Sequence, residues 1–134
     1  MMEDGAFRAE SVCYAVNLAK RINCSISVLM VATNTDHEDE SLIHDQKVVK
    51  KVLDMINVEG VNTQSTVRYG DKASELLKHL AASPSFEAII WGGEKKIVSG
   101  HNLKKPDHWL AKIEKTIQCP VVSPTKKRKN LKKT

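Results

Sequence analysis

The chain has 134 residues, the length of one domain, of which 41% are hydrophobic and 28% charged, as in an ordinary soluble globular domain. Its formal net charge of +5 comes from the last segment, where six basic residues follow one another without an acid: Lys126, Lys127, Arg128, Lys129, Lys132 and Lys133. Without these six, 15 basic residues stand against 16 acidic ones, which excludes a folded domain built as a basic nucleic-acid clamp.

The sequence indicates a cytoplasmic protein. No apolar run approaches the roughly 20 residues that a membrane span needs, and the acidic start lacks the apolar stretch of a signal peptide. Cys13, Cys24 and Cys119 are odd in number and far apart, which is typical of reduced thiols. A cytoplasmic domain of a membrane protein fits the same pattern.

The first half of the chain predicts a helix, a strand and a second helix. Residues 6–22 carry an apolar stripe with helical spacing, and residues 25–32 end in a run typical of a strand buried on both faces. Ser41 is expected to cap a helix that continues to about Val58 and stops at Gly60.

The second half continues the alternation. Residues 61–69 alternate between apolar and polar, which favours a strand at a sheet edge, and a strongly amphipathic helix follows Gly70. Residues 87–91 predict a buried strand, residues 92–106 a long loop, and Asp107 the cap of a last helix. A short strand over residues 120–123 ends the series.

Helices that alternate with strands predict an α/β fold, a three-layer sandwich with a mostly parallel sheet. The expected domain covers residues 1–124, and residues 125–134 form a basic disordered tail. Ligands of such sheets bind beyond the carboxyl ends of the strands. These ends are expected at residues 32–33, 70–71 and 92–93.

Five short stretches, in the same order and at similar spacing, resemble the universal stress protein family: residues 14–20, 27–31, 67–71, 88–92 and 118–122. The resemblance covers about residues 4–123. It implies a universal-stress-protein-like fold, of the adenine nucleotide alpha hydrolase-like type, with strand order 3-2-1-4-5. The strand that opens the family's fold would end near Asp4 and Gly5, and Met1 and Met2 are not expected to form it. A wrongly assigned start, a piece of a longer protein, rearranged pairing, or a strand from another chain would each account for this.

The resemblance implies two functional alternatives. Nucleotide-binding members of the family carry Gly-x-x-Gly followed by Gly-Ser or Gly-Thr, whereas here Lys95 takes the second glycine's place and Asp107 and His108 that of the last pair. The leading hypothesis is therefore a non-enzymatic stress-response or regulatory module that does not bind ATP in the family's manner. The alternative is an adenine-nucleotide-binding member with a degenerate phosphate loop. Its candidate site comprises Ala32 and Thr33 near the base, and Gly92, Gly93, Lys95 and His108 near the phosphates.

Each candidate motif also has a purely structural interpretation. Gly92 and Gly93 are explained by a turn that requires positive φ, followed by a solvated lysine loop. The His and acidic residues of segment 36–45 are explained by a helix N-terminus, so that no metal site is predicted. His108 and its neighbours lack a nucleophile placed by any motif, and no catalytic site is predicted.

The resemblance implies a homodimer joined through the last strand, at Pro120, Val121, Val122 and Ser123. A separate protein partner, or fusion to a larger, transporter-like membrane protein, is the alternative that the family offers. Lys126 to Lys133 are expected to be a solvated terminus, with nucleic acid or an anionic surface as the alternative contact.

Overall fold

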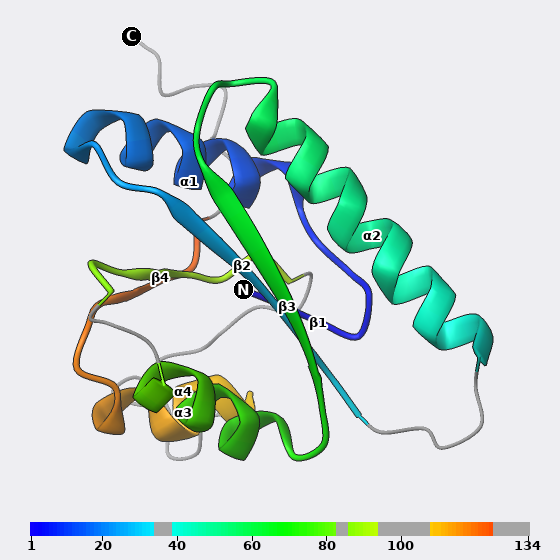
Figure 1. The fold of residues 1–134 in the computed structure, drawn as a ribbon. Helices are drawn as coiled ribbons and strands as arrows, with labels where there is room; N and C mark the ends of the chain where they lie inside the picture. Colours follow the sequence, from blue (N-terminus) through cyan, green and yellow to red (C-terminus); the bar gives the residue numbers. More distant parts are fainter. Residues whose placement is uncertain (34–38, 83–85, 94–107, 125–134) are drawn as a thin grey trace, which may run out of the picture.

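Helices and strands alternate along the chain in the computed structural model, which describes residues 1–33, 39–82, 86–93 and 108–124. This confirms the predicted α/β class with mostly parallel pairing. In chain order (Figure 1) the elements are β1 (Met2–Glu3), α1 (Ala9–Ile22), β2 (Ile26–Ala32), α2 (Asp39–Asn57), β3 (Thr63–Tyr69), α3 (Lys72–Ala82), β4 (Ile89–Ile90), α4 (Trp109–Ile113), the 3₁₀ helix η2 (Glu114–Thr116) and β5 (Val121–Val122).

The strands pair in parallel in two groups. β2 lies between β1 and β3, and its pairing with β3 extends from Ile26 opposite Thr63 to Ala32 opposite Tyr69. β4 pairs with β5 in the second group. Met1 joins the groups, because its nitrogen donates to the carbonyl of Ile90 (2.8 Å) and its carbonyl accepts from the Gly92 N–H (2.6 Å).

The expectation that Met1 and Met2 do not form the missing central strand is wrong. Met2 pairs with Met30 and Glu3 with Val31, so a two-residue strand stands beside β2. Met2 is only 3% exposed and belongs to the core. Two residues suffice at this position because β2 pairs with them on one side and the preceding Met1 binds Ile90 and Gly92 on the other, whatever the strand propensity of the side chains.

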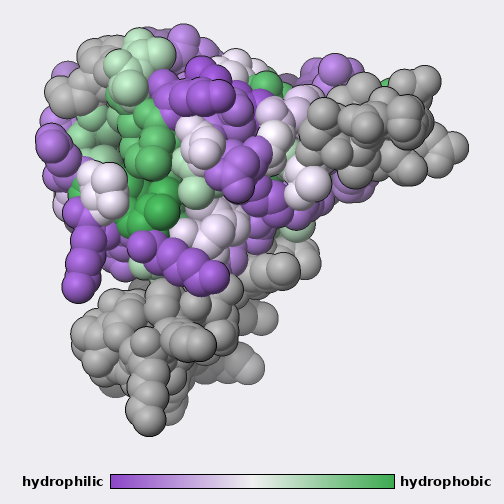
Figure 2. Space-filling model, turned by 90° about the horizontal axis from the view of Figure 1, so that it is seen from below, coloured by the Kyte–Doolittle hydropathy of each residue, from purple (hydrophilic) through white to green (hydrophobic). Residues whose placement is uncertain are grey.

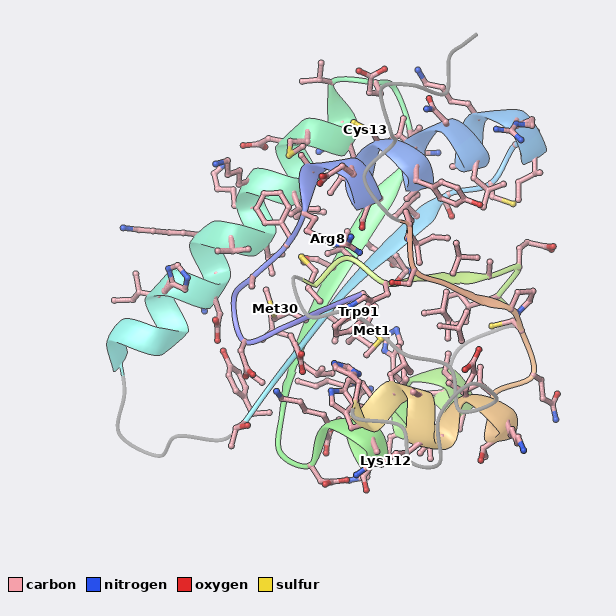
Figure 3. The ribbon with its side chains drawn as sticks, turned by 180° about the vertical axis from the view of Figure 1, so that it is seen from behind. Met1, Arg8, Cys13, Met30, Trp91 and Lys112 are labelled. Carbon is pink, nitrogen blue, oxygen red and sulfur yellow. The ribbon has the colours of Figure 1, made fainter. Side chains whose placement is uncertain are left out.

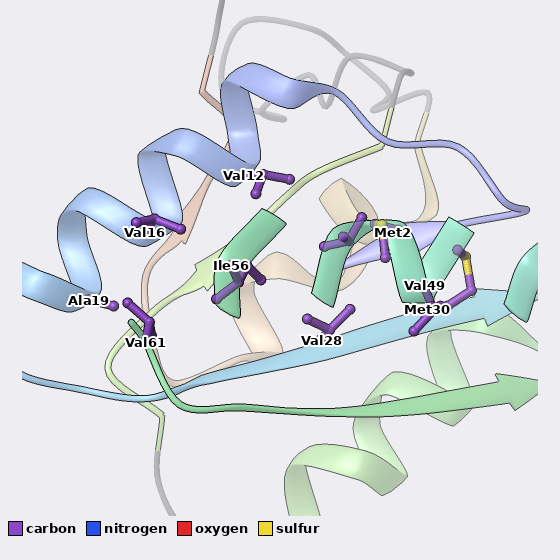
Figure 4. Packing of buried hydrophobic residues seen from close by; sticks show 10 residues of the cluster. Met2, Val12, Val16, Ala19, Val28, Met30, Val49, Ile56 and Val61 are labelled. Atoms are coloured by element: carbon purple, nitrogen blue, oxygen red, sulfur yellow. The ribbon is translucent and has the colours of Figure 1, made fainter. Parts of the chain in front are cut away.

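Alternate residues of β2 face two separate core clusters. Val28 and Met30 pack with residues of α1 and α2, as Figure 4 shows, whereas Leu29 and Val31 pack with residues of α3, α4 and β4. The helices therefore cover both faces of β2. This explains the unbroken apolar run in the sequence, since a parallel strand covered on both faces has no solvent side.

α1 begins later than predicted and ends where expected. Asp4 and Gly5 adopt positive φ (51° and 71°) and Arg8 is extended, so that the helix starts at Ala9 rather than at residue 6. At the other end Asn23 adopts the left-handed conformation (φ 59°), and its N–H donates to the Ala19 carbonyl. Asparagine tolerates this conformation better than most residues, and it closes the helix.

The predictions for the middle of the chain hold except at one cap. Ser41 is not the N-cap of α2, because the helix already begins at Asp39. β3 lies at the edge of its three-stranded group, as its alternating pattern predicts. α3 follows Asp71, whose carboxylate accepts a hydrogen bond from the Ser74 N–H (3.0 Å) and so caps the helix.

The C-terminal elements are shorter than predicted. β4 comprises two residues instead of the expected residues 87–91, and β5 comprises Val121–Val122 instead of the expected residues 120–123. The N-cap of α4 is His108 instead of Asp107, because the His108 side chain accepts from the Leu110 N–H. Asp107, Lys95 and the basic tail of residues 125–134 lie outside the described residues.

Figure 2, seen from below, shows hydrophobic side chains gathered on the side of the molecule where α3 and α4 lie in Figure 1. The partly buried hydrophobic residues of these two helices are Leu77, Leu80, Trp109 and Ile113. Among the helices of the described residues, none combines the length and apolar character that crossing a membrane requires.

Candidate functional site

The carboxyl ends of the strands meet at one edge of the sheet, where an α/β protein is expected to bind ligands. β1 leads into Asp4, β2 into Thr33, and β3 into Gly70 and Asp71. The Thr33 N–H donates to a carboxylate oxygen of Asp4 (3.3 Å), and the Gly70 N–H donates to the Ala32 carbonyl (3.0 Å). These bonds hold the ends of three strands together.

Glu3 is the centre of this edge. Its side chain is 6% exposed, and its Oε1 accepts from Trp109 Nε1 (2.8 Å) and Lys72 Nζ (2.9 Å), while its Oε2 accepts from His108 Nε2 (2.9 Å). Burial raises the pKa of Glu3. Its hydrogen bonds with Trp109, Lys72 and His108, together with the Lys72 charge, outweigh burial and lower this pKa to about 2.

His108 uses both ring nitrogens within the protein. Nδ1 accepts from the Leu110 N–H (3.1 Å), so the hydrogen lies on Nε2, which donates to Glu3. The ring also packs edge-on against Trp91, with 4.6 Å between centroids. His108 therefore links the start of α4 to β1 and is not presented to a phosphate.

Lys72 is shared by two carboxylates. Its Nζ binds both Glu3 and Asp4, and its side chain is 16% exposed. Burial lowers the pKa of Lys72, but the hydrogen bonds and charges of Asp4 and Glu3 outweigh this and raise it. Two carboxylates against one ammonium leave this cluster with a net negative charge, which disfavours a phosphate at this position.

The backbone at Gly92 and Gly93 is bound by the protein itself. The Gly92 N–H donates to Met1, while the Gly92 carbonyl accepts from the Arg8 N–H (2.7 Å) and the Gly93 carbonyl from Arg8 Nε (2.8 Å). Figure 3 shows Arg8, Met1 and Trp91 close together in the middle of the molecule. The Gly92 N–H needed for a phosphate cradle is thus already taken.

The interpretation of these glycines as a turn with positive φ is wrong. Neither adopts positive φ, and both are explained by close packing instead. A Cβ on Gly92 would stand 3.3 Å from the Met1 carbonyl oxygen, and a Cβ on Gly93 only 2.5 Å from the Trp91 ring. A side chain at Gly93 would displace an indole that is 0% exposed.

The structure brings together only part of the predicted nucleotide site. Ala32 is buried and Thr33 exposed at the end of β2, and His108 lies at the same edge through its bond to Glu3. Gly92 is bound to Met1 and Arg8, and Lys95 lies outside the described residues.

Sequence reasoning missed Glu3, Lys72, Trp109 and Arg8. The sequence did hold a signal for Glu3 and Lys72, because both are charged residues at or just after the carboxyl end of a strand. Nothing in the local sequence indicates that Arg8 binds a segment 85 residues away.

Asp45 forms a second buried polar contact, below the turn at Gly5. It accepts a hydrogen bond from the Tyr69 hydroxyl (3.4 Å), and burial raises the pKa of Asp45. The turn favours glycine because of its positive φ, and a Cβ on Gly5, 2.7 Å from both Asp45 and His44, would also push these two side chains aside. Within the described part of the chain, no three His, Cys, Asp or Glu residues are grouped to hold a metal ion.

A thiol-based site has little support from the three free cysteines. Cys13 is exposed on α1, whereas Cys24 and Cys119 are half-buried. Burial raises the pKa of the Cys119 thiol, which lowers its thiolate fraction at neutral pH.

Comparisons with known proteins do not assign the chain to a family. No protein-family model matches it, and a search of the curated proteins finds no match.

Proposed function

We propose that this protein is a non-enzymatic regulatory module of the universal stress protein type that does not bind ATP in the family's usual manner. The observation that carries the proposal is the closed cluster around Glu3. A buried carboxylate with three donors occupies the end of β1, where an α/β sheet normally receives its ligand. The carboxylate of the neighbouring Asp4 also forms an ion pair with Lys72.

The sheet order supports the family part of the proposal. β3, β2 and β1 lie side by side, and Met1 continues the hydrogen bonding to β4 and then β5. This sequence of strands agrees with the order 3-2-1-4-5 that the resemblance implies. A role in a stress response, and attachment to a transporter-like protein, rest on the resemblance alone.

The alternative is an adenine-nucleotide-binding protein. The observation in its favour is the bond between the Thr33 N–H and Asp4, which places a polar pair at the expected edge of the sheet. A thermal melt with and without millimolar Mg-ATP separates the two functions. Ligand at about 100 times Kd adds about 2.7 kcal/mol, which raises Tm by about 10 °C in a domain of this size. We expect no shift, and a shift of this size would overturn the proposal.

We also propose that two copies pair through β5. Pro120 and Val122 direct their carbonyls at β4, so the backbone groups of Val121 point to the outer edge, where a second strand can add. Val121→Pro removes the outer N–H and leaves the bonds to β4. Sedimentation velocity should show a dimer for the unmodified protein and a monomer for the variant. A dimer in both cases would contradict pairing through this edge.

A further inference from the structure

A groove continues the line of β1 between β2 and β4. Met1 and Met2 line its inner end, and Figure 1 shows the N-terminus lying between the two flanking strands. The groove has a volume of about 400 Å³. It extends alongside residues 26–29 of β2, which precede the first residue paired with β1 and span roughly 13 Å at the usual strand rise.

The β2 side of the groove is a strand edge. Successive residues of a strand direct their backbone groups to opposite edges. The Ile26 N–H donates to the carbonyl of Asn62, just before β3, whereas the Val31 carbonyl accepts from the Asp4 N–H on the β1 side. By this alternation, the backbone groups of Ser27 and Leu29 point toward the groove. Among the described residues, the strand paired with this edge begins only at Met2, opposite Met30.

The β4 side presents a matching edge. The N–H groups of Ile89 and Trp91 donate to the carbonyls of Pro120 and Val122, while the carbonyl of Ile90 and the N–H of Gly92 bind Met1. The same alternation turns the Ala88 carbonyl and the Ile90 N–H toward the groove. A strand that continues β1 backwards would thus meet a donor and an acceptor on each side, with the spacing that a parallel ladder requires.

Helices close the groove on both faces. Ala15, Leu18 and Ile22 line it from α1, and Leu76 and Leu80 line it from α3. A strand in this position would be covered above and below, as β2 is. Such strands are apolar at every residue rather than at every second one.

Two polar groups mark the ends of the groove. Ser11, which lines its inner end beside Gly92, is 2% exposed, and its Oγ has no hydrogen-bond partner among the described residues. Glu87 is exposed and lines the groove at its amino end, ahead of Ala88. A basic residue at the start of an entering strand would complement this carboxylate.

We propose that the groove accepts an extended, continuously apolar segment of a partner polypeptide, led by a basic residue, as a parallel strand added between β2 and β4. Main-chain hydrogen bonds to both edges hold the segment, and contacts with α1 and α3 select apolar side chains. This inference rests on the proposed regulatory function and names the class of its partner. The two proposals can fail separately, because a Tm shift on addition of ATP would contradict the proposed function and leave peptide binding in the groove unaffected.

The first test uses two fluorescein-labelled peptides, acetyl-Lys-Lys-Val-Ile-Val-Val-amide and the same sequence N-methylated on its four apolar residues. Fluorescence anisotropy with the full chain should show saturable binding of the first peptide. The second should bind about tenfold more weakly or worse, because its backbone donors are gone. Equal binding of both would identify a pocket for any apolar ligand and overturn the proposal, as would no binding of the first peptide.

The second test fills the groove from α1. Ala15→Trp places an indole in the groove, whereas Asn17→Trp places the same side chain on the exposed face of the same helix. Circular dichroism and thermal melts establish that both variants fold. Ala15→Trp should abolish peptide binding and Asn17→Trp should leave it unchanged. Unchanged binding by a folded Ala15→Trp variant would contradict the proposed position of the strand.

Discussion

The carboxylate of Glu3 and the imidazole of His108 are hydrogen-bonded at 2.9 Å, although 105 residues separate them in the chain. The bond ties the two-residue strand β1 to the N-cap residue of α4. It also sets the chemistry of the carboxyl edge. Glu3 binds His108 and Lys72, which would otherwise be available to an anionic ligand.

Replacement of Glu3 should destabilise the fold strongly. Glu3→Gln removes the charge that faces Lys72 and places an amide beside three donors, which should cost about 2–4 kcal/mol. Urea unfolding followed by circular dichroism measures this loss.

The matched control is Glu59→Gln. Glu59 pairs with Lys20 where both side chains are about half exposed, and such pairs contribute about 0.2–1 kcal/mol. Equal losses in the two variants would show that the Glu3 cluster is no stronger than a surface ion pair.

Glu3 should also make stability depend on pH under acidic conditions. Its pKa falls from an ordinary value of 4.5 to about 2 on folding. A depressed pKa contributes stability that is present above pH 4.5 and is lost as the pH falls toward 2, because the unfolded chain takes up the proton first. The contribution is about 3 kcal/mol.

The test compares the unfolding free energies of the unmodified protein and Glu3→Gln from pH 6 to pH 2. Subtraction removes the titration of the other acids, among them Asp45, whose raised pKa acts in the opposite direction. The difference between the two proteins should shrink as the pH falls. A constant difference would mean that the Glu3 charge is not what stabilises the cluster.

His108 should have two separable roles. Asparagine caps helices well but does not reach Glu3 in the same way, whereas alanine neither caps nor binds the carboxylate. His108→Ala should therefore be less stable than His108→Asn by about 1 kcal/mol, and both less stable than the unmodified protein. Chemical denaturation measures the three values. If Asn and Ala cost the same, the cap at Leu110 contributes nothing.

Gly93 should not tolerate a side chain. The Cβ of Gly93→Ala would press on the buried Trp91 ring, and overpacking of this kind costs about 1–3 kcal/mol. A displaced indole should also shift the tryptophan emission of the folded protein.

Gly60→Ala provides the comparison for that variant. Gly60 has open space around it but a φ of +80°, so alanine there meets backbone strain alone. That variant should lose about 1–2 kcal/mol without any change in emission. A shift in Gly60→Ala, or none in Gly93→Ala, would contradict the packing argument.

Ser11→Ala should stabilise the protein. The Ser11 Oγ is buried without a hydrogen-bond partner among the described residues, and an unsatisfied group of this kind costs about 1–3 kcal/mol. A rise in Tm measured by calorimetry is the expected result. A fall would mean that the hydroxyl is already bound in solution.

Local patterns predicted the long elements of the fold. The periodic apolar positions of α1 and α3, and the apolar run of β2, depend on neighbours a few residues apart, so the sequence alone reveals them. The edge position of β3 followed from its alternation for the same reason. β1 has two residues and no period, and its existence depends on hydrogen bonds to β2 and to the segment after β4.

The sequence by itself therefore determined the α/β class and the order of its main helices and strands, because amphipathic periods are local. It also pointed to the carboxyl edge, because ligand sites of parallel sheets lie there. Only the tertiary structure decided what that edge contains. The contacts of Glu3 with Lys72, His108 and Trp109, and those of Arg8 with Gly92 and Gly93, join residues between 69 and 106 positions apart. Such pairings arise when the strands come together, and no periodic pattern in the chain encodes them.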